Sequence, residues 1–274
     1  LDSSLVGSEM CIRDRYPTDD GWLSFSVEDL QGRFNLNALL AADTPPEAEG
    51  SDGAPEPSGA PQQAGSGRTV AQNRFLRLVR SVGETPMSEA EAVALLEAVQ
   101  DWLDADLLET GFGGAEQAYY AQLEVPYRPA DGPLRDASEL RLIKGVSAEL
   151  YSQLRPLVTV WPVDGSAISV SAAAAEILQA MHHDPENPTE PLGAVEAEAM
   201  VTALQEGEIA TLDELLRRPE WGPEPLPETG LVNRGQVFRV SAQTQVGRLR
   251  QGLTSVLWVN GDEIRILARN LTML

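Results

Sequence analysis

The residues of this sequence best suited to chemistry are carboxylates gathered in one short stretch. The segment QDWLDAD, residues 100–106, contributes Asp101, Asp104 and Asp106, and Glu116 follows in GGAEQAYY. On a helix Asp101 and Asp104 share a face because they are three residues apart, and the glycine-containing loop can fold Glu116 back toward them. Converging carboxylates repel one another unless a cation lies between them. Oxygen ligands of this kind suit calcium rather than zinc or copper.

The same four acids have a plainer interpretation. Their spacing is not that of an EF-hand loop, which alternates acidic or amide ligands and then requires a glycine. By spacing alone, a solvated acidic helix end explains them better than a metal site does. The residues themselves therefore leave both interpretations open.

Other catalytic groups are sparse. The two histidines, His182 and His183, are adjacent, and adjacent helical residues point in different directions rather than converging. The sequence contains neither a G-x-S-x-G nucleophile motif nor a phosphate-binding loop. We therefore predict a protein without enzymatic activity, whose work is done by its surfaces.

Charge and length narrow the class of protein. The 274 residues include 42 Asp and Glu against 20 Lys and Arg, a formal net charge of -22. Such a chain repels phosphate backbones and anionic membranes, so nucleic acid is not expected as a partner. No apolar run reaches the roughly 18 to 20 residues that span a bilayer. We expect a soluble globular chain with a packed core.

Strands are predicted at the start of the chain, ahead of the acidic stretch. Residues 22–28 alternate apolar and polar side chains, and the alternation resumes over 33–37 after a glutamine-glycine turn, as in a hairpin. Asn35 and Asn37 are unusual in a strand, because buried amides need partners. We expect them to act as a clasp that satisfies unpaired backbone groups where the sheet meets the next domain. A polar patch that contacts a partner is the alternative, and the alternation by itself does not decide between the two.

The composition then changes along the chain. Residues 43–68 are mostly Pro, Gly, Ala, Ser and Glu, which predicts a flexible low-complexity loop. Residues 69–222 show helical periodicity and two capping boxes, which begin at Ser88 and Thr211 and each place a glutamate three residues later. Residues 223–274 are strand-like again and contain an Asn-Gly hairpin signal.

This order of strands, helices and strands predicts an α+β fold. One antiparallel sheet would be formed by residues 16–42 and 223–274, with a large all-α domain inserted between its halves. A lone hairpin at the start of the chain would be only marginally stable, which favours a shared sheet. Residues 1–15, LDSSLVGSEMCIRDR, resemble a translated sequencing adapter and are predicted to be an artefactual or disordered leader.

Several motifs in a fixed order carry a family resemblance. DLQGRFNLN is followed by QDWLDAD, GAEQAYY, PYRPADGPLRDASELRLIKGVSAELYSQLRPLVTVWP and a strand-rich terminal segment. This order resembles that of general secretion pathway protein K, the large minor pseudopilin of type II secretion, over roughly residues 21–270. The resemblance implies a pseudopilin-type sheet with an inserted helical domain, in agreement with the order of elements above.

The resemblance also implies a place and partners. Proteins of this family lie at the tip of a short periplasmic pseudopilus with other minor pseudopilins, and secreted substrates are further candidate partners. They begin with a short basic leader and an apolar helix that anchors in the bacterial inner membrane. We expect this chain to be a fragment that starts after both segments, touching the membrane only through that missing N-terminal helix. The fragment itself would be a soluble periplasmic domain.

The resemblance bears on the acidic stretch as well. The family is known for calcium in its helical domain. This property favours a calcium cofactor over the solvated helix end, with Asp101, Asp104, Asp106 and Glu116 as the metal ligands.

A different class of function remains as the alternative. Residues 140–154, LRLIKGVSAELYSQL, resemble a helix-hairpin-helix unit, which in some proteins presents backbone amides to DNA phosphates. A nucleic-acid-binding module of this kind needs several cations, and the segment offers Arg141, Lys144 and the adjoining Arg155 in an acidic chain. A helical hairpin that packs its leucines into a core is the simpler explanation.

Overall fold

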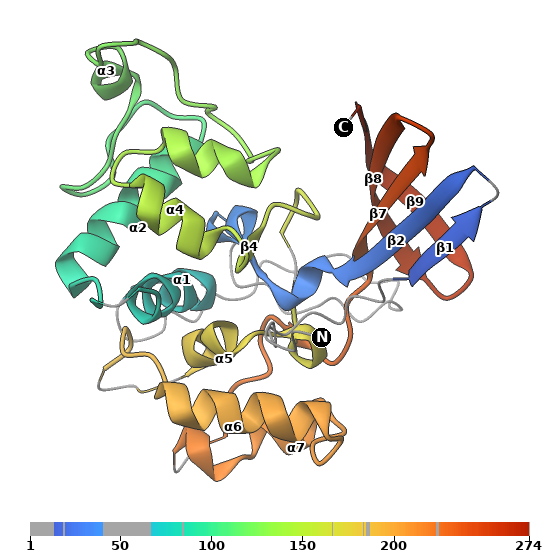
Figure 1. Cartoon of the computed structure of the whole chain (residues 1–274). Helices are drawn as coiled ribbons and strands as arrows, with labels where there is room; N and C mark the ends of the chain where they lie inside the picture. Colours follow the sequence, from blue (N-terminus) through green and yellow to red (C-terminus); the bar gives the residue numbers. More distant parts are fainter. Residues whose placement is uncertain are drawn as a thin grey trace, which may run out of the picture.

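The computed structural model describes residues 14–18, 20–40, 67–83, 85–165, 167–182, 184, 187–222 and 225–273. Most of the predicted leader 1–15 and of the predicted loop 43–68 therefore lies outside the described residues. The described chain forms two parts that lie side by side, a β-sheet and a helical domain (Figure 1).

The sheet joins the two ends of the chain. Its strands are β1 (Asp14–Thr18), β2 (Gly21–Asp29), β7 (Val237–Val246), β8 (Leu249–Asn260) and β9 (Glu263–Met273). They follow one another in the order β1-β2-β7-β8-β9, and every neighbouring pair is antiparallel. The prediction that the beginning and the end of the chain share one antiparallel sheet is confirmed.

Strand register gives this sheet an apolar face. Phe25 pairs with Ala242, which pairs with Leu253, which in turn pairs with Leu271, so one row of apolar residues crosses the sheet. Paired residues share a face, and alternate residues along each strand join them. What we call the apolar sheet face consists of Tyr16, Leu23, Phe25, Val27, Phe238, Val240, Leu253, Leu257, Ile264, Ile266 and Leu271.

The opposite face of the sheet is mixed, because its Val237, Val256 and Trp258 form a small buried core with Leu30. The row of residues next to Phe25 points to the opposite face and runs Ser26, Ser241, Thr254 and Asn270. The apolar sheet face remains partly open to solvent, and 63% of Leu271 is exposed.

The prediction that residues 33–37 form a strand of the antiparallel sheet is wrong. The chain leaves the sheet through two 3-10 turns, η1 (Leu30–Gly32) and η2 (Leu36–Leu39). Between them β3 (Phe34–Asn35) pairs in parallel with β4 (Val158–Thr159) instead of joining the antiparallel sheet. The alternation that predicted a strand arises because consecutive turns direct the apolar side chains of this segment into the helical core.

The boundaries between the sheet and the helical domain therefore differ from the predicted ones. Phe34 and Leu39 are buried in the helical core, so the first part of the sheet ends before them rather than at the predicted residue 42. Leu226 and Leu231 join the same core, so the helical domain extends past its predicted end at residue 222. Both segments cross between the two parts of the molecule.

Asn35 and Asn37 act as the predicted clasp. The Asn35 side chain accepts a hydrogen bond from the Asn37 backbone N–H and donates Nδ2 to the carbonyl of Pro162. The buried Asn37 amide donates Nδ2 to the carbonyls of Leu134 and Val160, both at 3.1 Å, and its Oδ1 accepts from the Leu134 N–H at 2.8 Å. The two amides therefore tie the exit of the sheet to loops 97 to 127 residues further along the chain.

The helical domain is layered around α1. Its helices are α1 (Val70–Ser81), α2 (Glu89–Leu103), α3 (Gln117–Tyr120), the 3-10 helix η3 (Ala137–Leu142), α4 (Ala148–Leu154), α5 (Ala175–Met181), α6 (Ala194–Gln205) and α7 (Leu212–Leu216). The short strands β5 (Ile168–Ser169) and β6 (Leu231–Val232) pair in parallel. Helix α1 contacts α2 on one side and α5 on the other, and α5 contacts α6 (Figure 1).

Local capping fixes where several of these helices begin. The capping boxes predicted at Ser88 and Thr211 are both present, at the start of α2 and α7. Thr69 and Gln72 form a further capping box at the start of α1. Each box satisfies backbone N–H groups that the first turn of a helix leaves unpaired.

A buried arginine fastens the centre of the helical domain. Arg77 donates to the carbonyls of Ala180 at 2.7 Å and Pro188 at 2.5 Å. Burial, together with the charge of Arg74, lowers the pKa of the Arg77 guanidinium to about 9. These hydrogen bonds replace part of the hydration that the guanidinium loses on burial, so α1 is held to the segment around α5.

Candidate metal centre

The end of helix α2 positions the first two carboxylates. Asp104 follows the last residue of the helix and has an extended backbone. Its carboxylate accepts a hydrogen bond from the Asp106 N–H at 3.3 Å, and the Asp106 carboxylate accepts from the Leu108 N–H at 2.7 Å. Aspartates favour turns of this type because the short side chain reaches the backbone two residues on.

Asp101 has a different role from the other three acids. It is fully buried, and its carboxylate accepts from the backbone N–H groups of Thr110 at 3.0 Å and Ala115 at 2.7 Å. A Cβ at Gly114 would lie 2.4 Å from Asp101 Oδ2, so glycine is what lets the loop approach this closely. Asp101 therefore fixes the loop that returns Glu116 to the end of α2.

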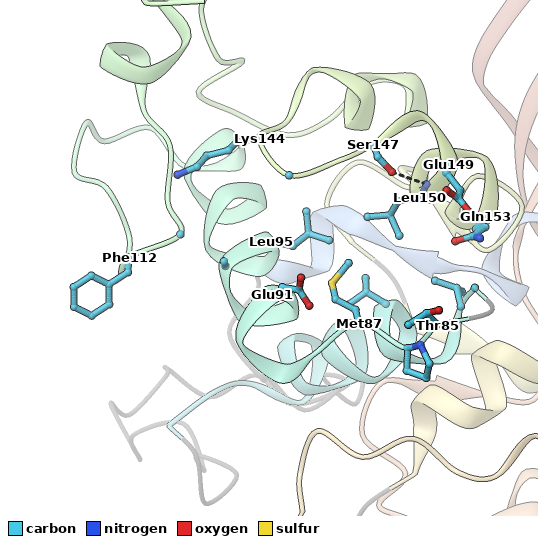
Figure 2. Close-up of a pocket in the computed structure, with 17 residues that line it drawn as sticks. Thr85, Met87, Glu91, Leu95, Phe112, Lys144, Ser147, Glu149, Leu150 and Gln153 are labelled. Carbon is cyan, nitrogen blue, oxygen red and sulfur yellow. Dashed lines mark hydrogen bonds between the residues drawn. The ribbon is translucent and has the colours of Figure 1, made fainter.

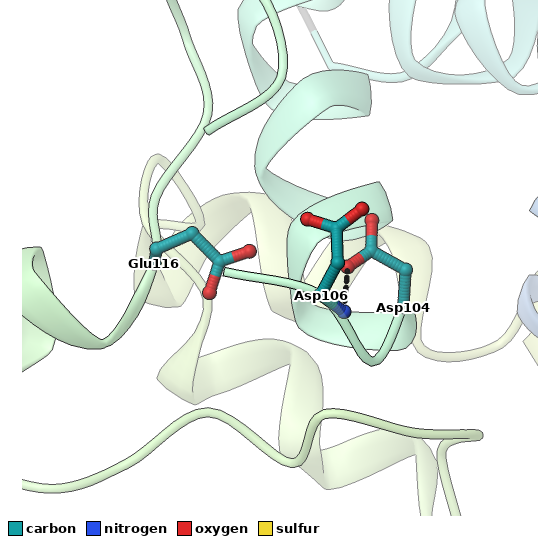
Figure 3. Close-up of side chains that lie close together, drawn as sticks. All are labelled: Asp104, Asp106 and Glu116. Atoms are coloured by element: carbon teal, nitrogen blue, oxygen red, sulfur yellow. Dashed lines mark hydrogen bonds between the residues drawn. The ribbon is translucent and has the colours of Figure 1, made fainter. Parts of the chain in front are cut away.

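Glu116 completes a group of three carboxylates. The carboxylate oxygens of Asp104, Asp106 and Glu116 lie within 4.8 Å of one another. Figure 3 shows Glu116 reaching toward the two aspartates from the returning segment of the chain. Only 3% of Glu116 is exposed, and neither of its oxygens has a well-formed hydrogen bond. A buried carboxylate in this state is costly unless a cation compensates it.

Electrostatics distinguish this group from an ordinary solvated helix end. Burial raises the pKa of Glu116 to about 7, and the negative charges of Asp101, Asp104 and Asp131 add to the rise. Burial also raises the pKa of Asp104, with a further contribution from neighbouring aspartates. A shared cation would reverse both effects, because it favours the ionised form of each carboxylate.

Asp131 is an acid near this group that the sequence interpretation missed. Its charge raises the pKa of both Asp104 and Glu116. Its backbone φ of 47° lies in the left-handed region, which few residues other than glycine adopt. The sequence signal is the pair Asp131-Gly132, which is typical of a turn, but nothing in the spacing connects this turn with the end of α2.

The arrangement fits a hard cation. The three oxygen-donating side chains suit calcium, which accepts six to eight oxygen ligands in flexible geometry, with backbone carbonyls and water completing the shell. Of the four predicted ligands, the structure brings Asp104, Asp106 and Glu116 together, whereas Asp101 is engaged by the loop that it holds. The buried and unpaired Glu116 is the observation that favours a metal here.

The helix-hairpin-helix candidate is a packed hairpin. Its two helices, η3 and α4, are joined through Gly145, whose φ is 86°. The Lys144 ammonium donates to the carbonyl of Gly114 at 2.9 Å and lies 5.0 Å from the centre of the Tyr119 ring. Arg141 likewise lies over a tyrosine ring. Two of the three cations that phosphate binding would use are thus occupied by contacts within the chain.

Comparison with solved structures defines the class of fold. A chain in the crystal structure of the GspK-GspI-GspJ complex from the enterotoxigenic Escherichia coli Type 2 Secretion System matches with a TM-score of 0.68. The match covers 95% of this chain and 83% of that chain, at 21% sequence identity. The molecule therefore has the mixed α+β fold of a pseudopilin, as predicted.

Comparison with known sequences gives the family. The family model of type II secretion system protein K matches residues 32–163. Relatives of that name include proteins from Aeromonas hydrophila, 35% identical over 59% of this chain, Pectobacterium carotovorum, 28% over 93%, and Pseudomonas aeruginosa, 30% over 92%. The chain belongs to the type II secretion system protein K family of minor pseudopilins, which confirms the predicted resemblance.

This chain covers only part of its relatives. It spans 44% of the Aeromonas protein, 71% of the Pectobacterium protein and 66% of the Pseudomonas protein. Within the described residues, no helix has the length and apolar character that crossing a membrane requires.

Proposed function

We propose that this chain acts as a non-enzymatic minor pseudopilin that caps the tip of the type II secretion pseudopilus and supports protein export. Family membership supports this role. The solved neighbour is a complex of GspK, GspI and GspJ, so the partners we propose are sibling minor pseudopilins of the GspI and GspJ types. Secreted substrates are a second class of partner in this proposal.

The observation that carries the proposal is the partly exposed apolar sheet face. Several apolar side chains of this face, Ile264 and Leu271 among them, are more than half exposed, as at surfaces that contact other proteins. We propose that the sibling heads, together with the apolar helix that the resemblance places before the strands, cover this face. We therefore place this chain at the inner membrane, with the described part in the periplasm.

Complex formation with the sibling heads tests the assembly role. The chain is mixed with purified GspI-type and GspJ-type periplasmic heads from the same source, and the mass of the complex is measured by size-exclusion chromatography with light scattering. Leu271→Glu places a charge on the apolar sheet face, whereas Asn270→Glu places the same charge on the opposite face of the same strand. We expect the first variant to weaken the complex and the second to leave it intact.

The outcomes of this experiment show separately whether the chain assembles with its siblings and whether it does so through the apolar sheet face. A folded chain that forms no complex at high concentration argues against tip assembly. A complex that both variants form equally well would support assembly through another surface. A salt-sensitive complex with DNA would instead support the helix-hairpin-helix alternative.

We further propose that the metal centre binds calcium through Asp104, Asp106 and Glu116, with Asp131 nearby. A bound cation would stabilise the ionised carboxylates and hence the fold, because it binds only the folded chain. Magnesium should stabilise less, since it demands tight octahedral geometry and retains its water.

Thermal melting tests the calcium site. The parent chain is melted in EDTA, in magnesium and in millimolar calcium, together with Asp104→Asn, Glu116→Gln and the control Glu124→Gln, which changes an exposed acid in the next loop. We expect calcium to raise the melting temperature of the parent and of the control but not of the two ligand variants. If calcium does not change the melting temperature of the parent chain, these acids are better explained as a solvated helix end.

A further inference from the structure

A groove of about 810 Å³ opens on the helical domain, between the α1–α2 connection, helix α2 and the start of α4 (Figure 2). Apolar and polar groups share its lining. The buried Val79, Val82, Leu95 and Leu150 form its floor with Met87 beside them, and polar side chains complete the lining, among them Thr85, Ser147 and Gln153. Grooves of this size and lining accommodate several apolar side chains, and a methionine adapts to different shapes of ligand. The groove is separate from the three acids of the metal centre, none of which lines it.

An unburied phenylalanine lies at the rim of this groove. Phe112 is fully exposed and projects away from the groove floor (Figure 2). Its loop is held in place, because the Gly113 N–H donates to the Glu97 carboxylate at 2.6 Å. A Cβ at Gly113 would lie 2.2 Å from the Ala94 Cα, so the loop approaches α2 as closely as glycine allows. The chain thus presents a large apolar side chain to solvent from a fixed loop.

The charges around the groove select against an anionic ligand. Lys144 is the cation of the lining, and its ammonium is already engaged by the Gly114 carbonyl and an aromatic ring. The first N–H groups of α2 are capped by Ser88 and Glu91. Of the two lining carboxylates, Glu91 accepts from the Ser88 N–H and hydroxyl, which leaves the exposed Glu149 to meet a ligand. Apolar side chains beside a carboxylate suit a ligand that combines apolar and basic groups.

The chain's own low-complexity segment does not have this chemistry. Residues 43–68 include five Asp or Glu residues and a single basic residue, Arg68. We propose that the groove binds an exposed peptide segment of another protein, in which apolar side chains alternate with or are flanked by Lys or Arg. Phe112 and the groove floor contact the apolar side chains, and Glu149 contacts a basic one.

Fluorescence anisotropy with labelled peptides tests this inference on the whole chain. The probes are peptides of about twelve residues in which leucine alternates with lysine, leucine with glutamate, or serine with lysine. We expect the Leu-Lys peptide to bind at least about tenfold more tightly than either of the others. The Ser-Lys peptide measures the nonspecific attraction of cations to a chain with a net charge of -22.

Matched variants locate the binding surface. Phe112→Ser and Glu149→Gln alter exposed rim residues and should each weaken Leu-Lys binding about threefold to tenfold, at an unchanged melting temperature. Val195→Ser removes another exposed apolar side chain, from α6, and should leave binding unchanged.

Several results would overturn the proposal. The proposal is wrong if the Leu-Lys and Leu-Glu peptides bind equally well, or if Phe112→Ser binds the Leu-Lys peptide as tightly as the parent chain does. It is also wrong if the chain binds a labelled DNA duplex more tightly than every peptide. The titrations are run in EDTA and without sibling pseudopilins. Their failure is therefore distinguishable from failure of the calcium site or of tip assembly.

Discussion

The buried Glu116 makes the stability of the calcium-free chain depend on pH. Its pKa rises from 4.5 to about 7 on folding, so between these values the folded chain holds a proton that the unfolded chain has released. The free energy of unfolding must therefore fall as the pH rises through this window. At about 1.4 kcal/mol for each pKa unit, the rise corresponds to about 3 kcal/mol.

The informative variant is Glu116→Gln, which imitates the protonated side chain at every pH. Near pH 4.5 the variant and the parent should unfold with nearly equal free energies, because Glu116 is protonated in the folded parent. At pH 8 in EDTA the variant should be more stable by about 3 kcal/mol. Glu124→Gln, at an exposed position, should follow the parent throughout.

Urea unfolding in EDTA, followed by tryptophan fluorescence at several pH values from 4.5 to 8, measures this difference. Urea is uncharged and does not screen the carboxylates as guanidinium chloride would. If the free energies of the parent and Glu116→Gln run parallel over the whole range, Glu116 ionises as freely in the folded chain as in the unfolded one. The buried carboxylate would then have no unfavourable charge for a cation to compensate.

Other side chains give further predictions. Asn37→Leu leaves three buried backbone groups without partners and should cost about 3 kcal/mol in urea unfolding, whereas the exposed Asn270→Leu should change stability by less than about 0.5 kcal/mol. Arg77→Met removes the hydrogen bonds to the carbonyls of Ala180 and Pro188 and should cost about 2 kcal/mol, whereas the exposed Arg217→Met should be nearly neutral in the same assay. Asp101→Ala leaves the N–H groups of its loop unpaired and should lower stability by about 3 kcal/mol in EDTA, which separates its structural role from metal binding.

Features that depend on neighbouring residues were predictable from the sequence. The capping boxes at Ser88 and Thr211 need only residues three apart, and both are present. The β8–β9 hairpin forms at the Asn-Gly signal, where Asn260 pairs with Glu263 and Gly261 has a φ of 57°. Alternation in β2 and in the C-terminal strands likewise reflects the two faces of the sheet, which local side-chain periodicity determines. The sequence therefore determined the α+β class, the shared sheet and the identity of the acidic stretch.

Contacts between distant segments were decided only by the tertiary structure. Residues 33–37 alternate like a strand, but their apolar side chains fit the helical core and β3 finds a parallel partner in β4, which no local pattern reveals. The acidic stretch contains similar carboxylates, yet packing buries Asp101 against loop N–H groups and leaves Glu116 buried without them. The physical reason is that burial and hydrogen-bond partners, rather than residue type or spacing, set the cost of a charge. Those partners come from segments that the chain brings together only when it folds.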